Sequence, residues 1–297
     1  MNDRPSVLPV PPAVAAGGAA PRPVNAMSVD VEDYFQVQAF SGHIRREDWP
    51  KLECRVERNT DRVLEIFAAG SCRATFFTLG WVAERYPALV RRIVAAGHEL
   101  ASHGYAHYRA DSQTPVEFRK DVEGTRKLLE DVGGVAVQGY RAASFSVGAR
   151  NLWAHEVLME AGYTYSSSVY PIRHDLYGMP EAPRFAFHPQ AAAKLLECPI
   201  TTVTVLGRNI PCGGGGYFRL LPYALSRRLM RRVNRVDGRP CIFYFHPWEV
   251  DPAQPRQHPI SLKTRVRHYT NLGRMEGRLR RLTRDFAWDR MDRVFLG

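Results

Sequence analysis

Two histidines in the segment 98–107 have the spacing of a metal-binding pair. The segment reads His98-Glu-Leu-Ala-Ser-His103-Gly-Tyr-Ala-His107 and follows an amphipathic pattern that ends at Gly97. Imidazoles at positions 103 and 107 can converge on one ion if the residues between them form a turn, which leaves room for a carboxylate and a water molecule. Two exposed loop histidines would give the same pattern, so the carboxylate has to come from another segment.

Three acids, Asp30, Glu32 and Asp33, lie at the end of the apolar run 25–31. Carboxylates this close repel one another unless a cation, an arginine or a proton compensates. A solvated acidic turn is the alternative reading. The apolar run before these acids predicts burial, however, which favours a metal site or a carboxyl group with a raised pKa.

A third histidine, His246, follows the apolar run 240–245 and precedes Pro-Trp248-Glu. The ordinary pKa of histidine lies near neutral pH, so this side chain could act as a general acid. A histidine satisfied within the core is the alternative.

Apolar and amphipathic segments alternate along the chain, and this predicts parallel βα units with catalytic groups at the carboxyl ends of the strands. The residues 114–117, Thr-Pro-Val-Glu, predict a capping box at a helix start, and 213–216, four glycines, predict a flexible turn. We expect strands over 25–31, 74–79, 98–101, 139–141, 163–166, 196–205 and 240–245, and helices over 61–69, 83–96, 114–132, 149–161 and 222–233.

Residues 25–250 resemble the NodB-type polysaccharide deacetylases, a carbohydrate esterase family whose fold is a distorted, incomplete (β/α) barrel. Ser28-Val-Asp30 matches the start of the family's Thr-Phe-Asp-Asp-Gly motif, which implies that Asp30 is the general base. Val31 replaces the second aspartate, so the acidic metal ligand moves to Glu32 or Asp33. Relatives with an Asp-x-Asp motif favour Glu32.

The other motifs of the family are matched to different degrees. His103 and His107 match the two metal ligands of His-Ser/Thr-x-x-His, although Gly104 stands at the Ser/Thr position. Arg141 matches the arginine that orients the base, and His246 matches the histidine of the Leu-x-His motif, the implied general acid. A backbone N–H near Ser144 or Phe145 is implied to face the oxyanion. The Asp and Trp of the fourth motif are not recognisable near 165–168. The substrate contacts that we expect are Tyr34, Ser144, Phe145, His174, Tyr177 and Trp248.

This resemblance implies hydrolysis of N-acetyl groups on the amino sugars of a polysaccharide, with one divalent metal. Zinc is the natural choice for these ligands, and cobalt, nickel or manganese also fit them. The C-terminal stretch is similar to the subgroup of deacetylases found with exosortase/PEP-CTERM exopolysaccharide loci, which implies a bacterial exopolysaccharide or a lipid-linked oligosaccharide as substrate. We therefore expect a disordered tail over 1–24, a deacetylase domain over 25–255, and a basic helical extension over 256–297 packed on the barrel.

Two other functions remain open at this stage. A metal-dependent hydrolase of another amide or of a cyclic imide would keep the same metal site. A glycan-binding protein with weak or lost catalysis would explain the altered first, third and fourth motifs. Hydrolysis that disappears in Asp30→Asn would exclude the binding protein.

The net charge of +11 favours anionic partners. Much of it comes from arginines of the C-terminal stretch, interleaved with a helical pattern of Leu272, Met275, Leu279 and Leu282. This pattern predicts a solvated helix face packed by its leucines, with weak membrane-surface association as the alternative. No zinc-finger or ribonucleoprotein signature indicates nucleic-acid binding. Five scattered cysteines and no recognisable signal or membrane segment predict a cytoplasmic location, at the inner face of the membrane if the substrate is lipid-linked. No feature of the sequence indicates an oligomeric state.

Overall fold

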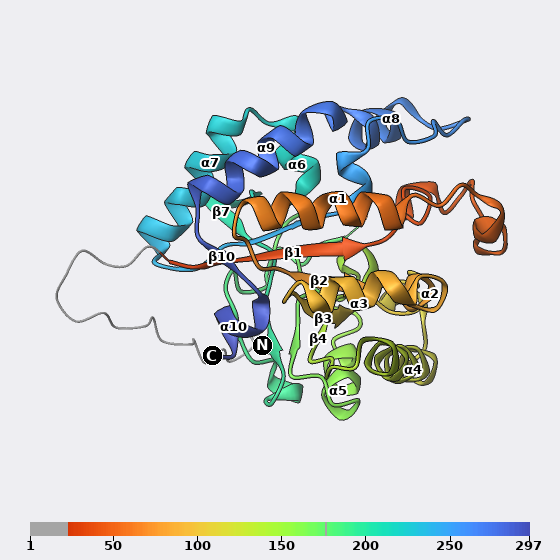
Figure 1. Ribbon diagram of the computed structural model, residues 1–297. Coiled ribbons are helices and arrows are strands. Elements are labelled where there is room, and N and C mark those ends of the chain that lie inside the picture. Colours follow the sequence, from red (N-terminus) through yellow and green to blue (C-terminus); the bar gives the residue numbers. More distant parts are fainter. Residues whose placement is uncertain (1–22, 176) are drawn as a thin grey trace.

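The computed structural model describes residues 23–175 and 177–297. Its main sheet is parallel and has the order β10-β1-β2-β3-β4-β5-β6, with β9 on the other edge of β1 (Figure 1). A separate antiparallel hairpin joins β7 to β8. The strands are β1 (Asn25–Val31), β2 (Thr75–Thr78), β3 (Glu99–Ser102), β4 (Gly139–Tyr140), β5 (Tyr165–Ser166), β6 (Leu196–Glu197), β7 (Thr202–Val205), β8 (Arg208–Pro211), β9 (Ile242–Phe245) and β10 (Trp288–Asp289).

Helices cover the outside of this curled sheet, and α6, α7 and α9 gather on one side of it (Figure 1). Among the described strands β6 does not pair with β9, so the structure confirms an incomplete (β/α) barrel. The α-helices are α1 (Val56–Ala69), α2 (Gly80–Arg85), α3 (Pro87–Ala95), α4 (Pro115–Gly133), α5 (Trp153–Glu160), α6 (Gly215–Leu220), α7 (Tyr223–Arg232), α8 (Leu262–Tyr269), α9 (Leu272–Asp285) and α10 (Met291–Phe295). A π-helical turn, η6 (Val233–Asp237), extends α7. Short 3-10 turns are η1 (Gln38–Phe40), η2 (Arg46–Lys51), η3 (Ala110–Ser112), η4 (Ala143–Phe145), η5 (Gln190–Ala192) and η7 (Pro247–Val250).

Strand β1 is buried along its whole length, as expected for a central parallel strand covered on both faces. Helix α4 begins with the predicted capping box, in which Thr114 and Glu117 cap each other's backbone N–H groups. Leu272, Met275, Leu279 and Leu282 of α9 are buried, which confirms the predicted packing of that helix. All five cysteines are free.

The structure changes the bounds of several predicted elements. The helix predicted over 83–96 is two helices, because Pro87 cannot donate a backbone hydrogen bond and starts α3 afresh. The turn predicted over the four glycines, 213–216, is shorter than expected, because α6 begins at Gly215. In the basic C-terminal stretch, helices α8 and α9 are separated at Asn271, whose φ of 57° is left-handed. The tail predicted over 1–24 lies outside the described residues except for its last two.

The C-terminal residues return to the main sheet. Strand β10 pairs with the start of β1, and the Met291 N–H donates to Thr75 Oγ1 at 2.8 Å. Helix α9 packs against α1 and η7. None of the helices in the described ranges is long and apolar enough to cross a bilayer.

Candidate active site

The polar side chains singled out in the sequence lie at the carboxyl ends of four strands of the main sheet. Asp30 is near the end of β1 and Glu32 follows that strand, His103 follows β3, Arg141 follows β4, and His246 follows β9. Because the strands are parallel, their carboxyl ends share one rim of the barrel, which explains how residues up to 216 positions apart come together.

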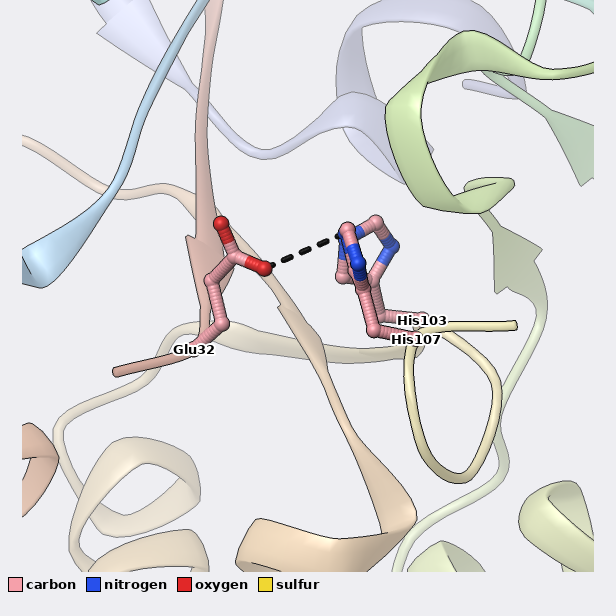
Figure 2. A group of neighbouring side chains, drawn as sticks. All are labelled: Glu32, His103 and His107. Atoms are coloured by element: carbon pink, nitrogen blue, oxygen red, sulfur yellow. Dashed lines mark ion pairs between the residues drawn. The ribbon is translucent and has the colours of Figure 1, made fainter. Parts of the chain in front are cut away.

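Glu32, His103 and His107 form a buried group whose ligand atoms all lie within 4.8 Å of one another (Figure 2). The Glu32 Oε2 atom lies 3.1 Å from His107 Nε2. Their exposed fractions are 2%, 2% and 5%, so bulk water is largely excluded from the group. One carboxylate and two imidazoles are a donor set that suits a catalytic zinc ion or a similar divalent cation.

The protonation of these side chains also fits a cation. His103 Nδ1 lies 2.8 Å from the carbonyl oxygen of Arg141, so this nitrogen carries the proton and Nε2 keeps its lone pair. Burial lowers the pKa of His103 and lowers that of His107 well below its ordinary value. Burial also raises the pKa of Glu32 to about 7, and Glu32 Oε2, although 3.1 Å from His107 Nε2, accepts no hydrogen bond from the described residues. Neutral imidazoles beside an unsatisfied carboxylate oxygen are what a divalent cation needs.

A tight turn brings the two histidines together. Gly104 has a φ of 72° and His107 a φ of 53°, both in the left-handed region. A Cβ atom at Gly104 would also lie 3.0 Å from Asp121 Oδ2, and the other oxygen of that carboxylate accepts the Tyr105 N–H at 2.9 Å. The backbone conformation therefore accounts for glycine at the position where the resembled motif has serine or threonine.

Asp33, the alternative acidic ligand, lies outside this group. Its Oδ1 accepts the N–H of Tyr34 at 2.8 Å, and its Oδ2 accepts the N–H groups of Arg55 and Val56 at 2.5 and 2.8 Å. Both oxygens of this carboxylate therefore accept backbone hydrogen bonds, two of them at the start of α1. Helix α1 begins five residues earlier than the sequence pattern indicated. Of the two candidates, the structure brings only Glu32 to the histidines.

Arg141 holds Asp30 in one orientation. Its Nη1 donates to Asp30 Oδ1 at 2.6 Å and to Ser28 Oγ at 2.9 Å, and its Nε and Nη2 donate to the carbonyl and hydroxyl oxygens of Ser167 at 3.2 and 3.0 Å. The guanidinium is fully buried and lies 4.0 Å from the ring centre of Phe77. A carboxylate fixed in this way is oriented for proton transfer without rearrangement.

Sequence reasoning missed Glu197, which fixes the backbone next to Arg141 through Ser168. Its Oε1 accepts the N–H groups of Ser168 and Val169 at 2.8 and 2.9 Å, and Ser168 Oγ accepts the N–H of Ala142, next to Arg141. Its Oε2 lies 3.1 Å from His155 Nε2, and both side chains are buried. The available signal was a single acid within the apolar run 195–200.

His246 lies across the group from Arg141. Its Nε2 is 3.3 Å from Glu32 Oε1 and 4.0 Å from Asp30 Oδ2, while its Nδ1 lies 2.9 Å from Glu249 Oε1. Burial lowers the pKa of this imidazole, but the carboxylates of Glu32, Glu249 and Asp30 outweigh burial and raise it to about 9. The side chain is 20% exposed, so it can reach a molecule that enters from solvent.

The six predicted substrate contacts divide into three groups. Tyr34 and Trp248 are buried in the hydrophobic core at 1% and 5% exposure, and burial raises the pKa of Tyr34 to about 12. Phe145, His174 and Tyr177 share a pocket of about 340 Å³ next to the site, in which His174 stacks on Tyr177 at 4.0 Å. Ser144 is half-buried.

Strained backbone marks this edge of the site. Ser144 and Phe145 are consecutive residues with φ of 54° and 49°, which is costly for residues other than glycine. The N–H of Phe145, one of the two oxyanion donors considered, already donates to Ala142 O at 3.0 Å.

Two family models match adjoining stretches of the chain. Residues 47–166 match the polysaccharide deacetylase family, and residues 167–296 match a domain of unknown function, DUF3473. The first match contains His103, His107 and Arg141, and the second contains His246. Asp30 and Glu32 precede both.

Curated relatives align with part of the chain. The peptidoglycan-N-acetylglucosamine deacetylase of Bacillus cereus is 32% identical over 36% of this chain and 38% of its own length. The chitooligosaccharide deacetylase of a Bradyrhizobium species is 27% identical over 40% of this chain and 49% of its own. The chain thus spans less than half the length of these relatives.

A solved structure shares the fold over nearly the full length. It is the crystal structure of a candidate polysaccharide deacetylase from Mycobacterium smegmatis, with a TM-score of 0.55 and 20% identity. The alignment covers 93% of this chain and 96% of the other.

Proposed function

We propose that this chain carries a polysaccharide deacetylase domain of the NodB type and hydrolyses N-acetyl groups on the amino sugars of a polysaccharide. The observation that carries the proposal is the convergence on one rim of a buried Glu/His/His group, an arginine-held aspartate and a third histidine. These are the parts that hydrolysis of an amide requires: a place for a cation, a base and an acid.

In the proposed reaction Asp30 is the general base. Its Oδ1 is held by Arg141, while Oδ2 points toward His246 at 4.0 Å and remains available to a water molecule. The carboxylate takes a proton from that water as the water attacks the acetamide carbonyl carbon. Because Arg141 is fixed by Ser28 and Ser167, the base does not have to be reoriented.

Glu32, His103 and His107 would hold the metal, which supplies a positive charge that polarises the carbonyl group and favours deprotonation of water. Zinc is the ion that we propose, and cobalt, nickel or manganese suit the same ligands. His103 is held for this role by the carbonyl oxygen of Arg141, so the base and the metal group share one support.

His246 completes the reaction as the general acid. It gives its Nε2 proton to the departing amine, so that the C–N bond breaks to release acetate and a free amino sugar. Glu249 holds Nδ1 and thereby directs Nε2 to the substrate side. The pocket lined in part by Phe145, His174 and Tyr177 adjoins the site through Phe145, whose ring centre lies 5.6 Å from the Arg141 guanidinium, and it has room for a neighbouring sugar ring.

As the natural substrate we propose a bacterial exopolysaccharide or a lipid-linked oligosaccharide. It is supported by the similarity of the motifs and the C-terminal stretch to the exosortase/PEP-CTERM subgroup. The +11 net charge suits an anionic polymer or a membrane surface that presents one.

The first experiment measures acetate release from an N-acetylhexosamine oligomer by the zinc-loaded protein, beside folded Asp30→Asn. We expect release by the wild type and a rate lower by roughly 10²–10⁴-fold in the variant, because the general base is lost while the other groups remain. Arg62→Gln, which breaks an exposed ion pair with Glu276, is the matched surface control and should stay within twofold of wild type. Equal rates in wild type and Asp30→Asn would contradict the proposal.

A further inference from the structure

Arg219 and the four glycines before it have no role in the reaction described so far. Arg219 lies on α6, is 1% exposed, and its Nε donates to Glu249 Oε2 at 2.6 Å. The other oxygen, Glu249 Oε1, accepts the N–H of His246 at 3.0 Å and faces its Nδ1 at 2.9 Å. One carboxylate therefore joins a buried arginine to the proposed general acid.

The glycine run makes room for this carboxylate. A Cβ atom at Gly215 would lie 2.4 and 2.6 Å from the two oxygens of Glu249. Any larger residue would displace the carboxylate from between Arg219 and His246. The close approach accounts for glycine at this position of the run.

The remaining donors of Arg219 reach the junction between α8 and α9. Nη1 donates to the carbonyl oxygens of His268 and Thr270 at 3.1 and 2.6 Å, and Nη2 donates to that of Arg267 at 3.0 Å. Asn271 returns a bond from its Nδ2 to the Arg219 carbonyl at 2.8 Å. The carbonyl groups at the end of a helix attract a cation, so the last turn of α8 holds the guanidinium in place.

An aromatic stack makes a second connection between the same segment and His246. The ring of His268, in α8, stacks on Trp248 with centres 4.2 Å apart, and Trp248 stacks on His246 with centres 5.1 Å apart. His268 Nε2 lies 2.7 Å from Gln254 Oε1, which fixes the far end of the stack. The position and the tilt of the His246 ring are thus set by Glu249 on one side and by Trp248 on the other.

We propose that Glu249 and Arg219, clamped by the α8–α9 junction, are positioning residues for His246. This clamp, formed by Glu249 and Arg219, keeps the proton on His246 Nδ1 and aims Nε2 at the leaving amine. Both residues lie in the region that matches the domain of unknown function, so that region helps to position the general acid. This rests on the proposed function of His246. It goes further in assigning the orientation of the acid to Arg219 and the C-terminal helices.

Kinetics of two conservative variants test the proposal. Arg219→Lys keeps the charge but not the four-way contact, and Glu249→Gln keeps the shape but cannot accept from both Arg219 and His246. We expect kcat to fall at least tenfold with KM within twofold, because the orientation of the acid matters in proton transfer and not in binding. Arg62→Gln again serves as control, since it breaks a contact of α9 with α1 that does not involve Glu249. Folded variants with unchanged kcat would overturn the proposal.

A spectroscopic measurement keeps the test independent of activity and of variant folding. In NMR spectra of the full-length wild type, the His246 Nδ1 proton should be shifted downfield and exchange slowly with water, and it should be lost in folded Glu249→Gln. A wild-type Nδ1 proton that exchanges at the rate of a free imidazole would overturn the clamp. If the wild type released no acetate while this proton was protected, the function would be refuted and the clamp would stand.

Discussion

At the scale of single residues, the site separates two acids that are neighbours in sequence and look equivalent there. Glu32 turns into the barrel rim toward His107, and Asp33 turns back to the start of α1. Strand β1 ends at Val31, so the direction of each acid is set by the contacts that it makes beyond the strand. Neither spacing nor composition could show this, because it depends on where α1 begins.

This separation predicts different effects for two alanine variants. Glu32→Ala should lower zinc affinity by roughly 100-fold or more, since it removes a direct ligand whereas loss of an outer-shell partner costs ~10–100-fold. Asp33→Ala should bind zinc as the wild type does but lose about 1–2 kcal/mol of unfolding free energy, because α1 loses its N-terminal acceptor. Calorimetric zinc titration and urea unfolding distinguish the two. The reverse pattern would make Asp33 the ligand.

Glu99 offers a pH-dependent test away from the site. Burial, with a further contribution from Asp292, raises its pKa to about 7, although Thr75 and Tyr165 donate hydrogen bonds to it. A raised carboxyl pKa adds stability below the unfolded value of 4.5 and loses it as the pH rises through about 7.

Between pH 5 and 8 the wild type should therefore lose roughly 1–3 kcal/mol of unfolding free energy through this group. In Glu99→Gln, which stays neutral, that loss should be absent, and urea unfolding at both pH values measures it. A variant with the same pH dependence as the wild type would refute the assignment to Glu99.

At the scale of elements, the sequence predicted the strands that carry the site better than the helices around them. The predicted run 25–31 coincides with β1, and 240–245 contains β9, because buried parallel strands are continuous apolar runs. The capping box of α4 was readable because both partners lie in one short motif. The early start of α1 was not, since its acceptor Asp33 lies 22 and 23 residues away.

Long-range contacts also explain which parts of the site escaped prediction. Glu197 reaches the site through the 166–169 loop and Arg219 through Glu249, and each contact joins elements far apart in sequence. The histidine pair and Arg141 were predictable because residue type and local spacing carry their signal. Tyr34 and Trp248 were expected to face a substrate because aromatic residues line glycan grooves, but here the core buries them.

At the scale of the whole molecule, the barrel is built from three stretches of sequence, and the site needs all of them. Asp30 and Glu32 come from the first strand, His103, His107 and Arg141 from the part that matches the deacetylase family, and His246 from the part that matches the domain of unknown function. The last of these also supplies β10, which pairs with the amino end of β1, the strand that carries Asp30. The two matched regions therefore contribute to one sheet and one site.

The central claim is that one divalent cation held by Glu32, His103 and His107 supports deacetylation by Asp30 and His246. Its most direct test is acetate release by metal-depleted protein as zinc is added back in measured amounts, with His103→Ala alongside. The account predicts a rate that rises to one equivalent of zinc and then stays level, and no comparable rise in the variant. Full activity in the metal-depleted wild type, or an equal response in His103→Ala, would contradict it.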